Sequence, residues 1–528
     1  MAGPSPFAAA VADGLRQAGV QRLFGVPGGA SLDLIEAAAD RGIGFVLAHT
    51  ESAACMTAAT YGRLTGTAGV AVVTRGPGLT SAANGLAQAT LDRYPLLLLA
   101  DGVPHADARR TAHQRLDQVR MAAPLTKQSG VLGNREPAAT VAAAAALACR
   151  PPAGAVHLTL DPSVPGGRLM TGHPAVTRAP GPGSLSDDVR AIFAGARRPV
   201  VIAGLDVADA AAALRSALSG LGCPVLATYQ AKGVVAETED DYAGLFTGGA
   251  IEAGLLRQAD LIVGVGLDPV EPLPGSWPYQ ADVVLLHRHP VEAGYFGERA
   301  RVVTGDYGAD LLPLLSQLRP SWPPGSGAKF RAAARGALED GAPGFRPQDA
   351  VRAVREVAGD VTVTVDAGAH MLVAMALWDT GHPGRVLISN GLATMGFALP
   401  AALGAALADP TSRVVCLVGD GGLGMVAAEL ETLARLDLDV TVVVFNDATL
   451  TLIELKQPPG ADPGAVAYRA TDFAAVARAM GVPAAVATTA GQLHHQLTGV
   501  PRGPFLVDAR IDRRSYRHVL QAIRGGLP

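Results

Sequence analysis

Short apolar runs rich in valine, isoleucine and leucine recur along the chain, and alanine-rich segments of helical character separate them. Glycine, proline or aspartate bounds each apolar run, which is the pattern of buried strands that end in turns. Strands that alternate with helices in this way are typical of βα units around parallel sheets. The sequence therefore predicts an α/β protein built from doubly wound parallel sheets.

The predicted strands fall into three groups. The first group lies at 44–49, 69–74, 95–102 and 154–160, the second at 199–205, 224–229, 260–266 and 282–287, and the third at 361–366, 385–389, 414–419, 440–446 and 504–511. Two segments dense in proline, glycine and serine, 171–186 and 319–327, separate the groups and are expected to cross the surface. We therefore expect three doubly wound α/β domains, at 1–170, 187–318 and 345–528.

Composition narrows the classes of partner. The length of 528 residues suggests about three domains. The charge is nearly balanced, with 43 basic and 47 acidic residues and no basic run, so we do not expect nucleic acid as a partner. Cys55, Cys149, Cys223 and Cys416 form no CxxC pair and indicate reduced core residues. No signal-peptide pattern opens the chain, and no apolar run approaches the roughly 18 residues of a membrane span. We expect a cytoplasmic protein with no membrane partner.

The segment 414–447 places polar residues at the ends of two predicted strands. Asp420 follows the first strand among several glycines, a helix is expected over 425–436, and Asn446 ends the second strand. Ligands collect at the carboxyl ends of parallel strands, where helix N-termini favour phosphate. Carboxylate and amide oxygens suit a Mg²⁺ ion that bridges to a diphosphate, although the same two residues could simply cap the turns.

This segment resembles the diphosphate and metal motif of thiamine-diphosphate enzymes, in the group of acetolactate synthase, pyruvate decarboxylase and benzaldehyde lyase. The resemblance implies that Asp420, Asn446 and the backbone carbonyl of Ala448 bind Mg²⁺. It also implies that Gly419, Gly421 and Gly422 surround the diphosphate. Gly422 stands where the family usually has serine, so one phosphate contact would be lost or taken over by the backbone.

Two further segments extend the resemblance. "NGLATMGFALPAALGAAL" (390–407) is similar to the family's support for the thiamine pyrimidine, where Met395 would bend the cofactor and the carbonyl of Ala393 would bind the aminopyrimidine. The family often has glycine in place of Ala393, and a lone methionine would otherwise be a core residue. "VDAGAHMLVA" (365–374) resembles the loop that contacts the diphosphate, with Gly368 and His370 as the matching residues.

The segment 48–78 resembles the pyrimidine-binding domain of the same family. By this resemblance 1–170 is that domain, 187–318 is the central domain and 345–528 binds the diphosphate and Mg²⁺. A helix is expected to start near Glu51, whose carboxyl group would bind a ring nitrogen of the aminopyrimidine, so that the imino nitrogen of the cofactor can act as the base. A lone glutamate there could instead face only the helix dipole. In the family this glutamate and the diphosphate site come from different subunits, which implies a homodimer or homotetramer with active sites at the subunit interface.

Other matches concern the substrates. Gly28 would line the mouth of the active site, and His113 and Gln114 align with the family's substrate-facing loop as candidate catalytic residues. Leu452 stands where pyruvate decarboxylases have a glutamate that helps release aldehyde. An apolar residue there is more compatible with an intermediate that is kept for an acceptor, and Thr451, Leu452 and Leu455 would line the acceptor pocket.

The residues and the resemblance favour a carboligase similar to acetolactate synthase. It would decarboxylate a 2-oxo acid such as pyruvate and transfer the carbanion to a small-molecule acceptor carbonyl. His113 motivates the alternative of a 2-oxo acid decarboxylase that releases aldehyde. A non-catalytic cofactor-binding protein is a third hypothesis, against which Glu51, Asp420 and Asn446 together argue. FAD, which acetolactate synthases hold in the central domain, is doubtful because no G-x-G-x-x-G follows a strand there.

Overall fold

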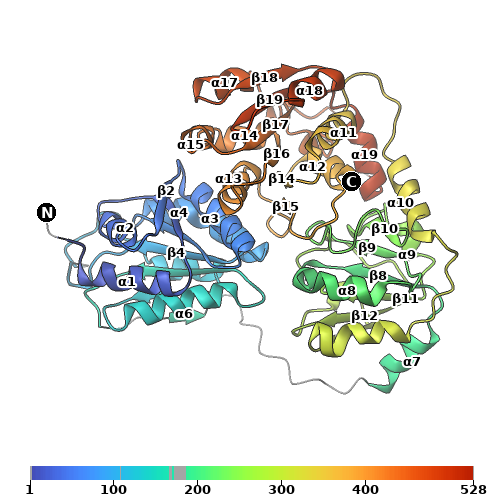
Figure 1. Cartoon of the computed structure of the whole chain (residues 1–528), viewed down its shortest axis with the longest axis horizontal. Helices are drawn as coiled ribbons and strands as arrows, with labels where there is room; N and C mark the ends of the chain where they lie inside the picture. The colour runs from blue at the N-terminus through green and yellow to red at the C-terminus, as the bar shows by residue number, and fades with distance from the viewer. Residues whose placement is uncertain (1–2, 108, 166–168, 172–185, 459, 527–528) are drawn as a thin grey trace.

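The computed structural model describes residues 3–107, 109–165, 169–171, 186–458 and 460–526. Within these residues, three separate sheets are flanked by helices (Figure 1). Each sheet contains six parallel strands, and the first sheet has a seventh, antiparallel strand at its edge. The predicted fold class is confirmed, and this antiparallel edge is the one departure from it in the described residues.

The first sheet has the strand order β2-β1-β3-β4-β6-β5-β7. Its strands are β1 (Arg22–Val26), β2 (Gly44–Leu47), β3 (Gly69–Val73), β4 (Leu96–Asp101), β5 (Gln128–Leu132), β6 (Ala155–Leu160) and β7 (Leu169–Thr171). The α-helices of this part are α1 (Pro6–Gln17), α2 (Ser31–Ala39), α3 (Glu51–Thr65), α4 (Pro77–Leu91), α5 (Gln118–Ala122) and α6 (Pro137–Cys149). β3 and β4 are buried along their whole length, which explains why they consist of continuous apolar runs.

The second sheet has the order β10-β9-β8-β11-β12-β13. Its strands are β8 (Pro199–Ala203), β9 (Val225–Ala227), β10 (Tyr242–Leu245), β11 (Leu261–Val265), β12 (Asp282–His287) and β13 (Ala300–Thr304). Helices α7 (Asp187–Gly195), α8 (Ala211–Leu218) and α9 (Ala253–Leu256) accompany it. The chain builds outward from β8 on one side and then returns to add β11 on the other, so the strand order reverses between β8 and β11.

The third sheet has the order β15-β14-β16-β17-β19-β18. Its strands are β14 (Thr362–Val365), β15 (Val386–Ile388), β16 (Val414–Gly419), β17 (Val440–Asn446), β18 (Ala484–Ala487) and β19 (Phe505–Arg510). The α-helices of this part are α11 (Pro347–Ala358), α12 (Ala369–Leu377), α13 (Ala398–Ala408), α14 (Asp420–Val426), α15 (Glu429–Arg435), α16 (Thr451–Glu454), α17 (Phe473–Ala479), α18 (Ala490–Leu497) and α19 (Ser515–Arg524). The single helix expected over 425–436 is wrong in its bounds: α14 begins at Asp420 and ends at Val426, and a second helix, α15, begins at Glu429.

Every strand expected from an apolar run is present. The structure adds β1, β5, β7, β10, β13 and β18, which the sequence did not reveal. β1 begins with Arg22, β5 begins with Gln128 and β13 is largely exposed, so none of these three has the uninterrupted apolar run that marks a buried strand.

Helices α3 and α13 join the first and third sheets in one hydrophobic core. A Cβ atom at Gly404 of α13 would overlap the carbonyl oxygen of Thr57 of α3, so the two helix backbones approach too closely for any larger residue. The Thr57 hydroxyl donates a 3.0 Å hydrogen bond to the carbonyl of Pro400. This contact fixes the helix that begins with Glu51 relative to the third sheet of the same chain.

The predicted linkers and cysteines can be placed in part. Residues 172–185 of the first linker lie outside the described residues. The second linker runs into α10 (Ser326–Gly336), and its Trp322 donates a 2.8 Å hydrogen bond to the carbonyl of Pro199. The four cysteines are free, with Cys149 half-buried and the others buried. Among the described residues, no helix combines the length and apolar character needed to cross a membrane.

Candidate active site

A cavity of about 260 Å³ lies where the central strands of the third sheet end. Many of the residues predicted to bind cofactor and substrate line it: Gly368, His370, Ala393, Met395, Gly419, Asp420, Gly421, Gly422, Thr451 and Leu452. Leu273 of the second domain adds to this wall. Of the residues that the structure describes, none from the first sheet or its helices lines the cavity.

Asp420 lies between the turn after β16 and the loop after β17. The backbone N–H of Gly421 donates a 2.8 Å hydrogen bond to Asp420 Oδ1. Burial raises the pKa of the Asp420 carboxyl, and backbone hydrogen bonds from Gly421, Ala448 and Asp447 act in the opposite direction. The carboxyl group therefore lies next to the loop that carries Ala448, as a shared metal site requires.

Asn446 ends β17 with its side-chain amide fixed by two acceptors. Its Nδ2 donates 2.9 Å to the carbonyl of Thr471 and 2.8 Å to Asp508 Oδ1. Because both amide hydrogens are used, the amide oxygen is the atom left for a cation. The carbonyl of Ala448 accepts a 2.8 Å hydrogen bond from the N–H of Tyr468 and keeps a second lone pair.

His370 lies in a cradle between two glycines. A Cβ atom would lie 2.9 Å from the imidazole ring at Gly368 and 3.2 Å from it at Gly419. The ring stacks on Phe445 with the ring centroids 5.4 Å apart, and burial lowers the pKa of His370 to about 4. Its Nε2 is buried and has no hydrogen-bond partner in the described part of the chain. An unsatisfied ring nitrogen at a cavity wall fits a polar ligand atom such as a phosphate oxygen.

Met395 is half-buried and faces the glycines after β16. Its Cε would lie 3.2 Å from a Cβ atom at Gly421, and Leu450 would lie 2.9 Å from the same atom. The methionine is therefore a cavity-wall residue rather than a core residue, as the predicted contact with the cofactor requires.

Asp366, which the sequence analysis missed, holds the segment that carries Met395. Its carboxylate accepts backbone hydrogen bonds from Gly396 at 3.0 Å, Phe397 at 2.8 Å and Ala398 at 3.1 Å. A Cβ atom at Gly422 would overlap this fixed carboxylate. The overlap gives a local reason why this chain has glycine where the family usually has serine.

Two alanines at the site adopt a backbone conformation that favours glycine. Ala393 has φ 54° and Ala448 has φ 58°. Left-handed backbone is unfavourable for residues with a Cβ atom and tends to occur where a ligand needs a particular carbonyl orientation. Both alanines are residues whose carbonyls were predicted to contact the cofactor or its metal.

Glu51 does not line the cavity and lies at the start of helix α3 in the first domain. It begins α3 after the N-cap residue Thr50, and Glu51 Oε1 would lie 3.5 Å from a Cβ atom at Gly78. Glu429 of α15 accepts backbone hydrogen bonds from His49 at 2.9 Å and from Thr50 at 3.2 Å. The third domain of the same chain thus anchors the start of α3.

The predicted substrate residues of the first domain gather near Glu51. Gly28 packs against the side chain of Thr74, directly after β3, and the backbone of Gln114 packs against Gly76. Gln114 lines a second cavity of about 210 Å³, and His113 beside it is exposed. Glu51 and the residues predicted to contact the substrate thus lie in the first domain, whereas the cavity lies at the third sheet.

Three regions of the chain match domains of thiamine pyrophosphate enzymes. Residues 6–121 match the N-terminal TPP binding domain, 186–312 the central domain and 366–509 the C-terminal TPP binding domain. The chain is 30% identical to the acetolactate synthase of Bacillus subtilis (strain 168) over 487 residues, which cover 85% of this chain and 82% of that protein. The chain belongs to the thiamine pyrophosphate enzyme family.

Other relatives agree with this assignment. The catabolic acetolactate synthase of Raoultella terrigena is 30% identical over 532 residues, which cover 95% of this chain and 94% of that protein. The large subunit of acetolactate synthase isozyme 2 of Escherichia coli (strain K12) is 30% identical over 463 residues, covering 84% of this chain and 83% of the relative.

The residues of the cavity fit thiamine diphosphate as the bound group of this family. Gly419, Gly421 and Gly422 line the cavity beside the N-terminus of α14, and the buried Nε2 of His370 on the same wall has no hydrogen-bond partner in the described residues. Oxygen atoms of Asp420 and Asn446 are of the type that Mg²⁺ prefers.

Three cavity residues lie far along the chain from the motifs that predicted the site. Tyr516 and Arg524 reach the cavity from α19, and Leu273 from the second domain. The amphipathic pattern of α19 predicts a helix but not which of its polar residues faces a ligand. Leu455, in contrast, packs against the core of the third sheet and is not a lining residue, so the geometry gives its predicted substrate role no support.

Proposed function

We propose that this thiamine pyrophosphate enzyme is a carboligase similar to acetolactate synthase. It would decarboxylate a 2-oxo acid such as pyruvate and join the remaining fragment to an acceptor carbonyl. The observation that carries the proposal is Leu452, a half-buried apolar residue of the cavity wall at the position where pyruvate decarboxylases have an acid. The similarity to several acetolactate synthases supports the same choice.

The remaining carboxyl groups of the cavity do not replace that acid. In the described residues, Asp420 and Asp447 are the only carboxylates of the lining. Asp420 belongs to the proposed Mg²⁺ site. Asp447 accepts a 2.6 Å hydrogen bond from the Thr451 hydroxyl and a 3.1 Å hydrogen bond from the N–H of Thr449. Burial raises the pKa of Asp447 to about 7, but these two hydrogen bonds hold its carboxyl group against Thr449 and Thr451. With an apolar residue and no acid at position 452, transfer to an acceptor is favoured over release of aldehyde.

The residues of this chain would divide the work as follows. Asp420, Asn446 and the carbonyl of Ala448 hold Mg²⁺, and His370 contacts the diphosphate. Met395 and the carbonyl of Ala393 orient the pyrimidine, and Glu51 holds a proton at one of its ring nitrogens. Bound thiamine diphosphate supplies a carbon that can accept and stabilise the negative charge left by decarboxylation.

We further propose that Glu51 reaches the cavity of a second copy of the chain. The cavity has no wall from the first sheet of its own chain within the described residues, and its acid is therefore missing there. A homodimer or homotetramer with active sites at subunit interfaces would supply it. We place this assembly in the cytoplasm.

The reaction can be tested directly. The purified protein, with thiamine diphosphate and Mg²⁺, is incubated with a panel of 2-oxo acids, with and without aldehyde and 2-oxo acid acceptors, and products are followed by NMR. We expect CO₂ together with a ligated hydroxy acid or hydroxyketone. Glu51→Gln should lose this activity by about 10² to 10⁴ in rate, whereas Glu356→Gln, at an exposed position of α11, should keep it.

The side chain at position 452 offers a test between the two reactions. Leu452→Glu should shift the products toward free aldehyde, and Leu452→Met should not, because it keeps the wall apolar. Rapid aldehyde release by the unmodified enzyme with no ligated product would reject the carboligase and favour the decarboxylase. Cofactor binding without any turnover would favour a non-catalytic role.

A further inference from the structure

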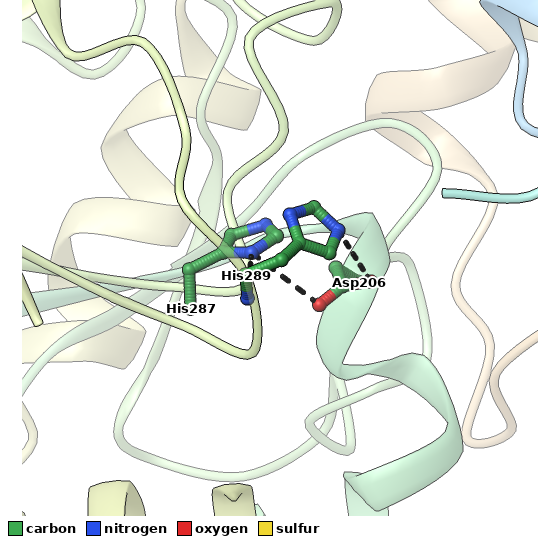
Figure 2. Close-up of side chains that lie close together, drawn as sticks. All are labelled: Asp206, His287 and His289. Atoms are coloured by element: carbon green, nitrogen blue, oxygen red, sulfur yellow. Dashed lines mark hydrogen bonds and ion pairs between the residues drawn. The ribbon is translucent and has the colours of Figure 1, made fainter. Parts of the chain in front are cut away.

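The second sheet contains a cluster of metal-ligand side chains that the proposed reaction does not use. Asp206 follows β8, His287 ends β12, and His289 lies two residues beyond it. Figure 2 shows the two imidazole rings facing the Asp206 carboxylate. One ligand atom from each residue lies within 4.8 Å of the others.

The cluster occupies the position where a parallel α/β sheet usually binds ligands. The strand order reverses between β8 and β11, and Asp206 lies at the carboxyl end of β8. The crevice outside such a reversal is the preferred ligand site of doubly wound sheets. A cavity of about 290 Å³ opens beside it, lined by Asp206, Asp209, Asp268 and Arg288 from this sheet and by Arg93 from the first domain.

Three of the four imidazole nitrogens of the cluster lack hydrogen-bond partners among the described residues, although both rings are buried. His287 is 0% exposed and His289 is 9% exposed. His287 Nε2 and both ring nitrogens of His289 have no hydrogen-bond partner in the described residues. Buried polar groups without partners are uncommon and often indicate an ion or water that satisfies them.

The contacts within the cluster bring acceptors together. His287 Nδ1 accepts a 3.4 Å hydrogen bond from the N–H of His289, so its lone pair, not a proton, lies on the side that is 3.7 Å from Asp206 Oδ2. His289 Nε2 lies 3.9 Å from Asp206 Oδ1. Burial lowers the pKa of His287 to about 3 and also lowers that of His289, so protons do not fill these gaps at neutral pH.

We propose that Asp206, His287 and His289 bind a divalent transition-metal ion of the Zn²⁺ class. Two neutral imidazoles and one carboxylate suit Zn²⁺, whereas Mg²⁺ prefers oxygen ligands. Zn²⁺ with bonds of about 2.0 to 2.1 Å places tetrahedral ligand atoms roughly 3.3 Å apart. The three ligand atoms here lie within 4.8 Å of one another, so they would move together by at most about 1.5 Å on binding the ion. The fourth position would face the neighbouring cavity and be open to water or a small oxygen ligand.

The charges around the cluster permit a dication. Arg288 donates a 2.8 Å hydrogen bond to Asp206 Oδ2 and also pairs with Asp209, while Arg93 pairs with Asp268 at 2.9 Å. Three carboxylates therefore face two guanidinium groups, and the imidazoles are neutral. Asp206 Oδ1 has no hydrogen-bond donor among the described residues and remains available as a ligand.

The experiment uses the full chain loaded with thiamine diphosphate and Mg²⁺, so that the cofactor site does not compete. After treatment with a chelator and reloading, Zn²⁺ is added, and retained metal is counted by mass spectrometry after gel filtration. We expect one Zn²⁺ per chain. Co²⁺ in its place should give the intense visible absorption of a four-coordinate site.

Matched variants assign the ligands. His289→Ala and His287→Gln should each weaken Zn²⁺ binding by about 100-fold or more, whereas His495→Ala, at an exposed position of α18, should leave it unchanged. Circular dichroism reports whether each variant folds. If the unmodified protein retains no stoichiometric Zn²⁺, or if all variants retain it equally, the proposal is wrong; the first of these results does not depend on any variant folding.

Discussion

At the scale of single residues, Arg524 is the cavity residue with the clearest unused charge. It lies at the end of α19, and no hydrogen bond or ion pair joins its guanidinium to another described residue. The rest of the wall near it is largely apolar, with Leu273, Leu452 and Ile453 as examples. A 2-oxo acid carries a carboxylate, and an arginine in an apolar cavity is suited to bind it.

We expect Arg524→Gln to raise the KM for the 2-oxo acid by about tenfold with little change in kcat. A charge-assisted hydrogen bond contributes about 1.5 to 3 kcal/mol, and an interaction made equally in substrate and transition state affects KM alone. Steady-state kinetics with varied donor concentration measures both constants. Arg517→Gln, exposed on the same helix, is the control.

The result could contradict this role in two ways. A fall in kcat with unchanged KM would place Arg524 in the chemical step. A loss of affinity for thiamine diphosphate, measured by calorimetry, would show that the guanidinium binds the cofactor's diphosphate instead of the donor.

At the scale of elements, α15 positions the helix that begins with Glu51, the proposed catalytic acid. Glu429 is buried and accepts the backbone N–H groups of His49 and Thr50, immediately before Glu51. We expect Glu429→Ala to destabilise the protein by about 2 to 3 kcal/mol, because two part-buried backbone N–H groups lose a charged acceptor. We also expect it to lower kcat, because α3 would no longer hold Glu51 in place.

The conservative variant separates these effects from a loss of charge. Glu429→Gln keeps an oxygen acceptor and should retain most of the kcat and of the thermal stability. Melting temperatures and kcat are measured for both variants. If the two variants lose kcat equally, the negative charge of Glu429, and not its hydrogen bonds, is what matters.

The strand pair β5–β6 contains a buried histidine with a predictable effect on pH-dependent stability. His157 Nδ1 lies 2.8 Å from the Ser129 hydroxyl, and burial lowers the pKa of His157 to about 3. In the unfolded chain the pKa is about 6.5, so below that pH the unfolded state binds more protons. The contribution of the neutral His157 side chain to the free energy of unfolding is therefore fully present above pH 6.5 and is lost as the pH falls toward 3.

Replacing His157 tests whether acidification destabilises the protein through this side chain. Relative to His157→Gln, the unmodified protein should lose about 2 kcal/mol of stability between pH 8 and pH 5. The difference in melting temperature between the two proteins, measured at both pH values, should shrink or reverse on acidification. His495→Gln on α18 should show no such change, since this side chain is exposed. A constant difference for His157→Gln would mean that the pKa of His157 is the same in the folded protein as in the unfolded chain.

Residues at strand ends could be predicted from the sequence, whereas residues that contact distant elements could not. Asp420 and Asn446 were predictable because each lies directly after an apolar strand, and position within a βα unit is a local property. Asp366, Asp508 and Glu429 were not predictable, because each acts on a segment distant in the sequence: the turn at 396–398, Asn446 and the start of α3. Local periodicity carries no information about such contacts.

At the scale of the whole molecule, Glu51 lies in a different part of the chain from the cavity of the third sheet. α3 is fixed against α13 and Glu429 of its own chain, and the cavity receives no residue from the first sheet within the described parts. We expect the complete site to combine Glu51 of one copy with the cavity of another. Symmetric assemblies then contain one such site per chain.

Mixed assemblies test this arrangement. Glu51→Gln and Asp420→Ala should each inactivate a homo-oligomer. When the two variants are co-expressed with different tags and the heterodimer is isolated, one of its two sites combines an intact Glu51 with an intact cavity. We therefore expect about half of the unmodified activity per dimer. A pairing of Glu51→Gln with the double variant Glu51→Gln/Asp420→Ala offers no intact Glu51 and should stay inactive. If Glu51 instead served the cavity of its own chain, no chain in the first heterodimer would hold both intact residues, and co-expression would restore nothing.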